Sequence, residues 1–390
     1  MKRRTSITVL SALALAATAS LLLAGPLNPP AGPVTSTSKA LTEVEPRIAV
    51  NTTNTPGDST FTFRITQPGS YYLTSNVEAV AGKAGIQIAS SNVTLDLNGF
   101  TLRGTGATSL QAVASSGTSV VIKNGIIKSW GSAGVATGAY TTVQNMTIES
   151  VGNVGIALSS GIVENCVVRD AGTVGIQTGV SSTVRDCTVL SSGSHGIQAA
   201  SFSQVRNCIS SSNGGNGILA LNSTIVGCST HNNTLSGVRS DNLCTIIDCI
   251  ALQNTLDGFE LTAQDTITGS TSNQNDGNGI SAGSRCRIED NTCNDNGSGS
   301  STAAGILLKT GGSRNHVKNN TLVGNDWGIK VDSTLNLITG NGSSSNATSN
   351  FTIAVGNRVT TIVNLTTNAA LINGNSGGAS TAEADANYAY

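Results

Sequence analysis

The chain has 390 residues and a formal net charge of -1 at pH 7. Only 11% of its residues are charged and 3% are aromatic, whereas 45 are Gly. This composition, with abundant Ser, Thr and Asn, is typical of short strands joined by polar turns and argues against a helical protein. The nearly neutral charge, with no basic cluster beyond the first four residues, argues against a nucleic-acid partner.

The N-terminus reads as an export signal. Lys2, Arg3 and Arg4 precede an apolar run that ends at Ala24, which is the pattern of a secretory signal. We therefore expect residues 1–24 to be a signal peptide and the protein to be extracellular, periplasmic or held at the cell surface; a retained membrane anchor is the alternative. Residues 25–44 are rich in Pro and predict a flexible linker. No later apolar segment approaches the length of a membrane span.

Residues 45–80 predict an N-terminal cap. Phe61, Phe63, Tyr71 and Tyr72 gather in this short segment, although aromatic residues are rare elsewhere. The end of a stack of strands is an unpaired sheet edge, and bulky side chains are suited to cover it.

A repeat fills the middle of the chain. A Gly followed by an aliphatic or aromatic residue recurs about every 21 residues, the period of a solenoid with one coil per repeat. We expect residues 81–345 to form an all-β fold, a right-handed parallel β-helix of about 11 to 12 coils stacked about 4.8 Å apart. The pairs are Gly134-Val135, Gly155-Ile156, Gly175-Ile176, Gly196-Ile197, Gly217-Ile218, Gly237-Val238, Gly258-Phe259 and Gly279-Ile280.

Each repeat also carries a second pattern, for which residues 184–189 are an example. Apolar and polar residues alternate, which predicts a strand with one buried face. An Asn, Asp or Gly then precedes a Cys, and these residues tolerate the left-handed backbone of a sharp bend. The bend residues Asn124, Asn145, Asn165 and Asn207 are therefore interpreted as turn formers.

The cysteines of this pattern predict a ladder inside the helix. Cys166, Cys187, Cys208, Cys228 and Cys249 share one inward slot, which Ser270, Asn291, Asn320 and Asn341 continue. Neighbouring side chains in such a ladder point the same way, with Cβ atoms about 4.8 Å apart, beyond the usual range for a disulfide. We expect buried reduced thiols, with disulfides or an internal metal as the alternatives. Cys244 and Cys286 occupy the slot of Ser182, Ser203 and Ser223, two coils apart, and should not pair.

The end of the chain departs from the regular repeat. Residues 346–378 predict cap strands, with Phe351 and Ile353 closing the core, and residues 379–390 predict a loosely ordered tail. The insert at residues 294–304 is rich in Ser and Gly. Such a loop either shapes a binding face or is tolerated surface variation.

Three segments carry a family resemblance. Glu45-Pro46-Arg47, residues 67–73 (Gln-Pro-Gly-Ser-Tyr-Tyr-Leu) and residues 93–99 (Val-Thr-Leu-Asp-Leu-Asn-Gly) resemble exported bacterial right-handed β-helix repeat proteins, as does the closing segment 385–390. More widely, the fold resembles the pectate-lyase-like superfamily, which includes polysaccharide lyases, polygalacturonases, mannuronan epimerases and phage tailspikes. The resemblance implies a carbohydrate partner but identifies no chemistry.

The catalytic motifs that this resemblance implies are missing. There is no Asp-Asp pair of the kind that polygalacturonases use, and His195 stands in Ser194-His195-Gly196 without the companion motifs. The Asp-Pro-His-Asp motif of mannuronan epimerases is absent, and no coil offers a dense acidic set for calcium. The sequence therefore requires no cofactor, and we assign no metal site.

The best candidate site is an outward stripe on consecutive coils. Arg239 and Glu260 should stack one strand spacing apart, with Asp241 and Asp257 nearby, so Asp257 and Glu260 are the candidate acid and base and Arg239 their partner. The alternative is a surface ion pair of little consequence. The stripe consists of Gln177, Gln198, Leu219, Arg239, Glu260 and Ser281, beside the turn residues His195, Asn216, Ser236, Asp257 and Asn278. The candidate substrate-binding residues on and beside the stripe are His195, Gln198, Asn216, Asp241 and Asn278.

A second candidate cluster falls in the last long coils. Trp327 could stack on a sugar ring, with Lys330 beside it, or could instead shield a coil junction. Arg314, His316, Lys318 and Asp332 are grouped with them by sequence position.

We therefore predict an exported monomer that binds extracellular or cell-envelope polysaccharide, with catalysis open. Two other functions stay as alternatives, a passive structural rod at the cell surface and a polysaccharide lyase or glycoside hydrolase.

Overall fold

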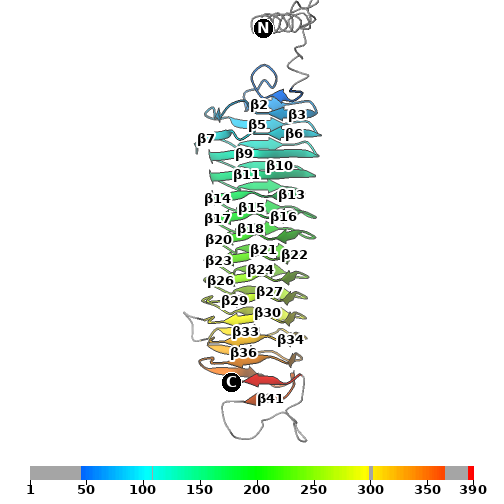
Figure 1. Ribbon diagram of the computed structural model, residues 1–390, viewed down its shortest axis with the longest axis vertical. Coiled ribbons are helices and arrows are strands. Elements are labelled where there is room, and N and C mark those ends of the chain that lie inside the picture. The colour runs from blue at the N-terminus through cyan, green and yellow to red at the C-terminus, as the bar shows by residue number, and fades with distance from the viewer. Residues whose placement is uncertain (1–44, 108, 298–301, 365–384) are drawn as a thin grey trace, which may run out of the picture. The chain divides into compact units, whose positions relative to one another are not determined.

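The computed structural model describes residues 45–107, 109–297, 302–364 and 385–390. The chain divides into two units, Met1–Pro46 and Arg47–Tyr390. The predicted signal peptide, residues 1–24, and the predicted linker, residues 25–44, lie outside the described residues. Within the second unit, Figure 1 shows coils of short strands stacked one on another.

Two parallel sheets form the walls of this stack. The first has 14 strands, one from each coil: β2 (Phe61–Ile65), β5 (Ala84–Ile88), β8 (Val113–Ser115), β10 (Val135–Thr137), β12 (Ile156–Leu158), β15 (Ile176–Thr178), β18 (Ile197–Ala199), β21 (Ile218–Leu221), β24 (Val238–Asp241), β27 (Phe259–Ala263), β30 (Ile280–Ser284), β33 (Ala304–Leu308), β36 (Trp327–Val331) and β39 (Ser349–Ile353). The predicted all-β solenoid is confirmed, but the expected 11 to 12 coils were too few, because strands already pair in this sheet from residue 61 and continue to residue 353.

The second sheet has 28 strands. It is bent, and most coils contribute two strands to it, one on each side of the bend. Its first strands are β1 (Ile48–Ala49), β3 (Gly69–Tyr72), β4 (Val77–Glu78), β6 (Val93–Asp96), β7 (Thr101–Gly106), β9 (Val120–Trp130), β11 (Thr141–Val151), β13 (Gly161–Glu164), β14 (Val167–Ala171), β16 (Thr183–Arg185), β17 (Thr188–Leu190), β19 (Gln204–Arg206), β20 (Ile209–Ser211), β22 (Thr224–Val226) and β23 (Ser229–His231). It continues with β25 (Thr245–Ile247), β26 (Ile250–Leu252), β28 (Thr266–Thr268), β29 (Thr271–Asn273), β31 (Arg287–Glu289), β32 (Thr292–Asn294), β34 (His316–Lys318), β35 (Thr321–Val323), β37 (Leu337–Thr339), β38 (Gly342–Ser344), β40 (Arg358–Val359), β41 (Ile362–Asn364) and β42 (Asn387–Ala389).

The repeated Gly-aliphatic pair sets the register of the 14-stranded sheet. Ile176, Ile197 and Ile218 pair with one another on consecutive strands and are fully buried, so the predicted aliphatic column is confirmed. The Gly before each of them permits the next coil to approach closely. A Cβ at Gly196 would lie 2.7 Å from the carbonyl oxygen of Gly217 in the following coil, which only Gly avoids.

The bends between paired strands of the 28-stranded sheet behave as predicted. Asn165 has a φ of 50°, Asp186 of 54° and Asn207 of 51°, all in the left-handed region. Asn and Asp tolerate this conformation better than other residues with a Cβ. Each bend therefore turns the chain at the same point of the coil.

The cysteine ladder lies where it was predicted. The structure describes all eight cysteines of the chain as free and buried. Each Sγ in the main ladder donates to carbonyl oxygens nearby, and that of Cys187 lies 3.1 Å from the carbonyl oxygen of Arg185. The slot continues through Ser270, whose Oγ accepts from the backbone N–H of Cys249 at 3.1 Å.

Asparagine ladders replace apolar residues in the later coils. Asn233 shows the pattern, since its Oδ1 accepts from the N–H of Asn213 at 3.1 Å while its Nδ2 donates to Asn254 Oδ1 at 2.9 Å. These amides satisfy backbone groups that the bends would otherwise leave buried without partners. The longest ladder is Asn213, Asn233, Asn254, Asn275, Asn296, Asn325 and Asn346.

The predicted loose tail is wrong for the last residues of the chain. Asn387–Ala389 forms β42, which pairs with both β38 and β41. Asn387 Oδ1 accepts from the N–H of Asn341 at 3.0 Å and so adds a further rung to an asparagine ladder. The C-terminus is ordered because it completes buried hydrogen bonds that the preceding coil leaves open.

Candidate functional site

The predicted outward stripe exists and lies on the 14-stranded sheet. Consecutive strands pair Gln177 with Gln198, Gln198 with Leu219, and Arg239 with Glu260. Alternation along each strand points these side chains outward, because their neighbours at both sides are buried. The sequence thus placed this face correctly.

Glu260 is the centre of an ion cluster on this stripe. Its Oε2 lies 3.8 Å from Arg239 Nη1, and its Oε1 lies 3.2 Å from Lys309 Nζ. Arg239 also approaches Asp241, with 3.5 Å between Nε and Oδ1. The structure therefore brings together Arg239, Asp241 and Glu260 as predicted and adds Lys309, which sequence reasoning missed. Lys309 lies two coils beyond Glu260, and Gly283 stands at its position in the intervening coil, so no side chain blocks its path.

Asp257 is held in the turn beside the stripe. Its Oδ1 accepts from the backbone N–H and from Nδ2 of Asn278, both at 2.8 Å, and its Oδ2 accepts from the hydroxyl of Ser281. Asn278 in turn accepts from the N–H of Ala304 at 2.9 Å. Both side chains therefore link consecutive coils, which gives Asp257 and Asn278 a structural role in addition to any chemistry.

His195 and Asn216 continue this line of turn contacts. His195 Nδ1 accepts from the N–H of Asn216 at 3.0 Å, and Asn216 Oδ1 accepts from the N–H of Ser236 at 3.0 Å. Burial, and then the positive charge of Arg239, lower the pKa of His195, which keeps Nδ1 free to accept. Asn216 is only 3% exposed. Gln198, by contrast, lies on the outward stripe and is partly exposed.

The second predicted cluster is split by the fold. Trp327 and Lys330 lie on β36 in the 14-stranded sheet, and Lys330 Nζ stands 5.4 Å from the centre of the Trp327 ring. His316 and Lys318 lie on β34 in the other sheet. Grouping them by sequence position was wrong, because a coil turns between the two sheets within a few residues. Trp327 is half-buried, and its Nε1 is buried with no partner in the described part of the chain.

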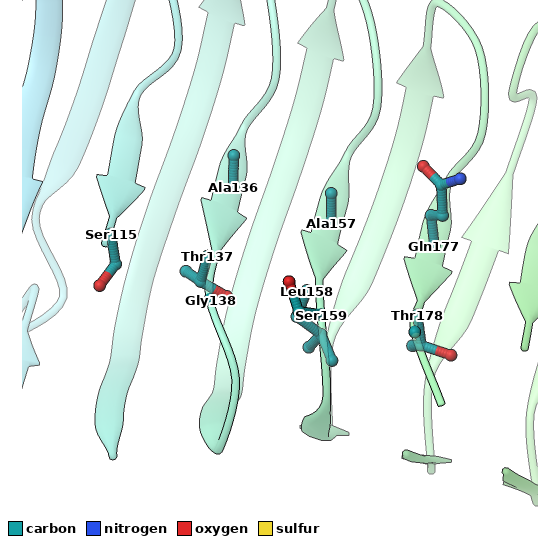
Figure 2. A pocket seen from close by; sticks show the side chains of 10 residues that line it. Ser115, Ala136, Thr137, Gly138, Ala157, Leu158, Ser159, Gln177 and Thr178 are labelled. Atoms are coloured by element: carbon teal, nitrogen blue, oxygen red, sulfur yellow. The ribbon is translucent and has the colours of Figure 1, made fainter. Parts of the chain in front are cut away.

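An open groove continues the stripe toward the N-terminal coils. It has a volume of about 580 Å³ and crosses strands β8, β10, β12 and β15. Figure 2 shows the small side chains of Ala136 and Ala157 and the longer amide of Gln177 on neighbouring strands. Ala157 pairs with Gln177, so the groove and the ion cluster share one outward column. The hydroxyl oxygens of Thr137 and Thr178, which line the groove, are buried and have no hydrogen-bond partner within the described residues.

Two exposed aromatic residues stand at the edge of this face. Tyr140 follows the groove residue Gly138 by two positions, and Phe202 lies on the corresponding turn three coils later. Each is 73% exposed and has a left-handed backbone, with φ of 57° and 63°. Bulky residues rarely adopt this conformation. Neither residue was predicted from the sequence, although each is an aromatic residue at a turn position that neighbouring coils fill with Ser160, Ser181 and Asn222.

The described residues contain no group of three or more His, Cys, Asp or Glu side chains that could hold a metal ion. They also include no helix that is both long and apolar enough to cross a membrane.

Fold and register together define a right-handed β-helix with a polar outer face. The family model described as "Right handed beta helix region" matches residues 65–204 and 177–341, and the chain belongs to this family. No curated protein sequence matches the chain.

Solved structures with the same fold include three epimerases. The Azotobacter vinelandii mannuronan C-5 epimerase AlgE6 A-module is 14% identical over 75% of this chain and 90% of its own, with a TM-score of 0.53. The AlgE4 A-module from the same organism is 16% identical over 75% and 91%, with a TM-score of 0.52. A variant of the periplasmic alginate epimerase AlgG is 14% identical over 80% and 79%, with a TM-score of 0.53. At these identities the likeness establishes the fold alone.

Proposed function

We propose that this protein is exported and binds a polysaccharide chain along the outer face of the 14-stranded sheet. The observation that carries the proposal is the alignment of the open groove with the Glu260 ion cluster in one outward column. From Ala157 to Glu260 this column runs over five coil spacings, about 24 Å. An extended polymer lying parallel to the stack would contact both regions at once.

The chemistry of the groove suits sugar hydroxyl groups. Ser159 and Gln177 present an exposed hydroxyl and an exposed amide in the groove, which ligand hydroxyls could pair with. The lining is otherwise small, so a ring can approach the sheet closely. Tyr140 and Phe202, about 14 Å apart by coil spacing, offer exposed apolar ring faces along the edge of this outward face.

The similar structures support a carbohydrate ligand by analogy only. The named proteins are epimerases of mannuronan or alginate, and one is periplasmic. Because this chain lacks the Asp-Pro-His-Asp motif, the analogy extends to the kind of ligand and not to the reaction.

A catalytic role is the second candidate, and one observation favours it. Asp257 and Glu260 lie in the same coil, where Glu260 contacts two cations and Asp257 accepts hydrogen bonds. In that case Glu260 and Asp257 would supply the acid and the base between them, and Arg239 would stabilise developing negative charge.

The test is a polysaccharide panel with retention and product release read for the same samples. We expect wild type to be retained on at least one glycan, and the double variant Tyr140→Asn and Phe202→Asn to lose at least about tenfold in affinity, as stacking contacts of this kind suggest. Ile250→Asn is the control, since Ile250 is 47% exposed but lies on β26 of the 28-stranded sheet, away from the groove and the Glu260 cluster.

The outcomes separate the three functions. Release of sugar products that stops in Glu260→Gln would establish the enzyme. Retention without products would support the binding protein. Absence of both signals across neutral and acidic glycans would reject the proposal and leave a structural rod.

A further inference from the structure

A second pocket lies on a different part of the surface, near the C-terminal end of the stack. It has a volume of about 610 Å³ and lies where the chain turns from the 14-stranded sheet into the 28-stranded sheet. The residues that decide its chemistry are Arg314, His316, Leu335, Leu337, Gly356 and Arg358.

The register of the coils explains how this pocket forms. His316, Leu337 and Arg358 pair in sequence on β34, β37 and β40. Arg314 and Leu335 occupy the same turn position in two consecutive coils. The N–H of Leu335 donates to the carbonyl oxygen of Gly356, which occupies that position in the third coil. Because Gly356 has no side chain, the turn position is empty in that coil, and the two leucines form a floor between Arg314 on one side and Arg358 on the other.

Within the described residues, three arginines of this edge lack a carboxylate partner. No ion pair within the described residues joins Arg285, Arg314 or Arg358 to an acid, whereas Arg287 pairs with Glu289 at 2.7 Å. His316 Nδ1 also lies 3.1 Å from Glu289 Oε1, so this carboxylate already has two basic neighbours. The chain as a whole has a net charge of -1, which makes an excess of positive charge here a local feature.

The close spacing of these arginines does not stabilise the fold. Arg285 and Arg314 stand one coil apart, and like charges at that spacing repel each other. Both have a φ of 60°, and Leu335 has a φ of 63° while it is 62% exposed. The left-handed turn itself recurs in other coils, for example at Phe202, Leu243 and Gln264. The distinctive feature of this edge is therefore that two consecutive coils place at the turn an arginine with no ion pair among the described residues, which points to an anionic ligand.

We propose that this pocket binds a soluble phosphate ester, with the phosphate held between Arg314 and Arg358 and the organic part resting on Leu335 and Leu337. Guanidinium groups bind tetrahedral oxyanions with paired hydrogen bonds. A phosphate monoester has close to two negative charges and three terminal oxygens, so it matches two guanidinium groups on opposite walls better than a carboxylate does. This site is separate from the polysaccharide groove and does not depend on it.

The experiment is titration calorimetry of the full chain with phenyl phosphate, inorganic phosphate and benzoate. We expect phenyl phosphate to bind most tightly, benzoate at least about tenfold more weakly, and affinity to fall as ionic strength rises. The double variant Arg314→Gln and Arg358→Gln should lose at least about tenfold in affinity for phenyl phosphate.

Two further variants make the test specific. Arg206→Gln removes an exposed arginine from a distant coil and should leave binding unchanged. Leu335→Asn keeps a residue suited to the left-handed turn and should weaken phenyl phosphate binding without changing that of inorganic phosphate. Equal affinity of wild type and the double arginine variant, or equal affinity for benzoate and phenyl phosphate, would overturn the proposal.

Discussion

The two halves of the solenoid build the same coil with different interiors. In one slot of the earlier coils the residues are Trp130, Val151 and Ala171, all buried and apolar. From Asn213 onward the same slot holds asparagines that donate to and accept from the neighbouring coils. A bend can therefore be filled by apolar volume or by a continuous amide ladder, and the backbone geometry remains the same.

The outer edge changes along the same direction. Exposed aromatic residues stand at the turn beside the neutral groove, whereas arginines occupy that turn near the C-terminal end. The interior of a coil is fixed by what stacks above and below it, but its turn position is free to vary. Surface chemistry can therefore differ between coils that share one fold. The two proposed sites differ in this way, because one has aromatic residues at the turn and the other has arginines.

The largest expected effect comes from interrupting the amide ladder. Asn254→Ala removes the acceptor of the Asn233 N–H and the donor to Asn275 Oδ1, both in the core. We expect a loss of about 3–5 kcal/mol in the free energy of unfolding, because several buried polar groups lose partners together. Chemical denaturation measures this change.

The matched control in the apolar half is Val151→Ala. It removes only buried apolar volume and should cost about 2 kcal/mol. Equal losses at the two positions would mean that the amides act as simple fillers and that the two interiors do not differ in kind.

A buried carboxylate offers a pH test of the same interior. Asp265 is fully buried in the slot of Cys244 and Cys286, where it accepts from the N–H of Cys244 at 2.8 Å and from Ser240 Oγ at 2.9 Å. Burial raises its pKa, so the folded state favours the protonated form. Its contribution to stability is therefore fully present below the ordinary pKa of 3.8 and is lost as pH rises through the raised value.

Thermal unfolding of wild type and Asp265→Asn from acid to neutral pH measures this effect. The difference in Tm, wild type minus variant, should fall as pH rises, because only wild type loses stability by ionising at this site. A difference that stays constant across the range would show that Asp265 has the same pKa in the folded and unfolded states.

The exposed turn edge can be tested with Phe202→Asn. Asparagine adopts the left-handed backbone more readily than phenylalanine, and Phe202 is 73% exposed, so little burial is lost. We expect the variant to be more stable by about 0.5–1 kcal/mol and weaker in glycan binding. Loss of stability instead would mean that the Phe202 ring packs on the coil and is there for folding.

These comparisons also show what a sequence can reveal about such a chain. The Gly-Ile pairs and the Cys slot located the buried columns, because stacking forces each coil to repeat its inward positions. The coils were undercounted because strands such as β2, β8 and β39 lack that pair. Arg239, Asp241 and Glu260 were found together because outward positions follow the same register.

Other features could not be found in this way. Lys309 reaches Glu260 across two coils, past Gly283, and the irregular spacing after Gly279 hides that proximity. The pocket at Arg314 and Arg358 depends on which turn position is empty, and the period alone does not show where each side chain of a long coil points. The pattern of repeats thus predicts the interior well and the turns poorly.

The smallest expected effect on stability is that of Glu260→Gln. Glu260 contacts Arg239 at 3.8 Å and Lys309 at 3.2 Å, but both cations are more than one third exposed, so solvent screens the pairs. We expect a change below about 0.5 kcal/mol in unfolding free energy. Arg185→Gln, which removes the partner of Glu164 on the other sheet, is the control for an ordinary surface pair.

If both variants unfold like wild type while only Glu260→Gln alters glycan retention or turnover, the charges at Glu260 contribute to ligand binding and not to stability. A large loss of stability from Glu260→Gln would instead make the cluster a clamp between coils, and the polysaccharide site would then have to rest on the groove and its aromatic edge alone.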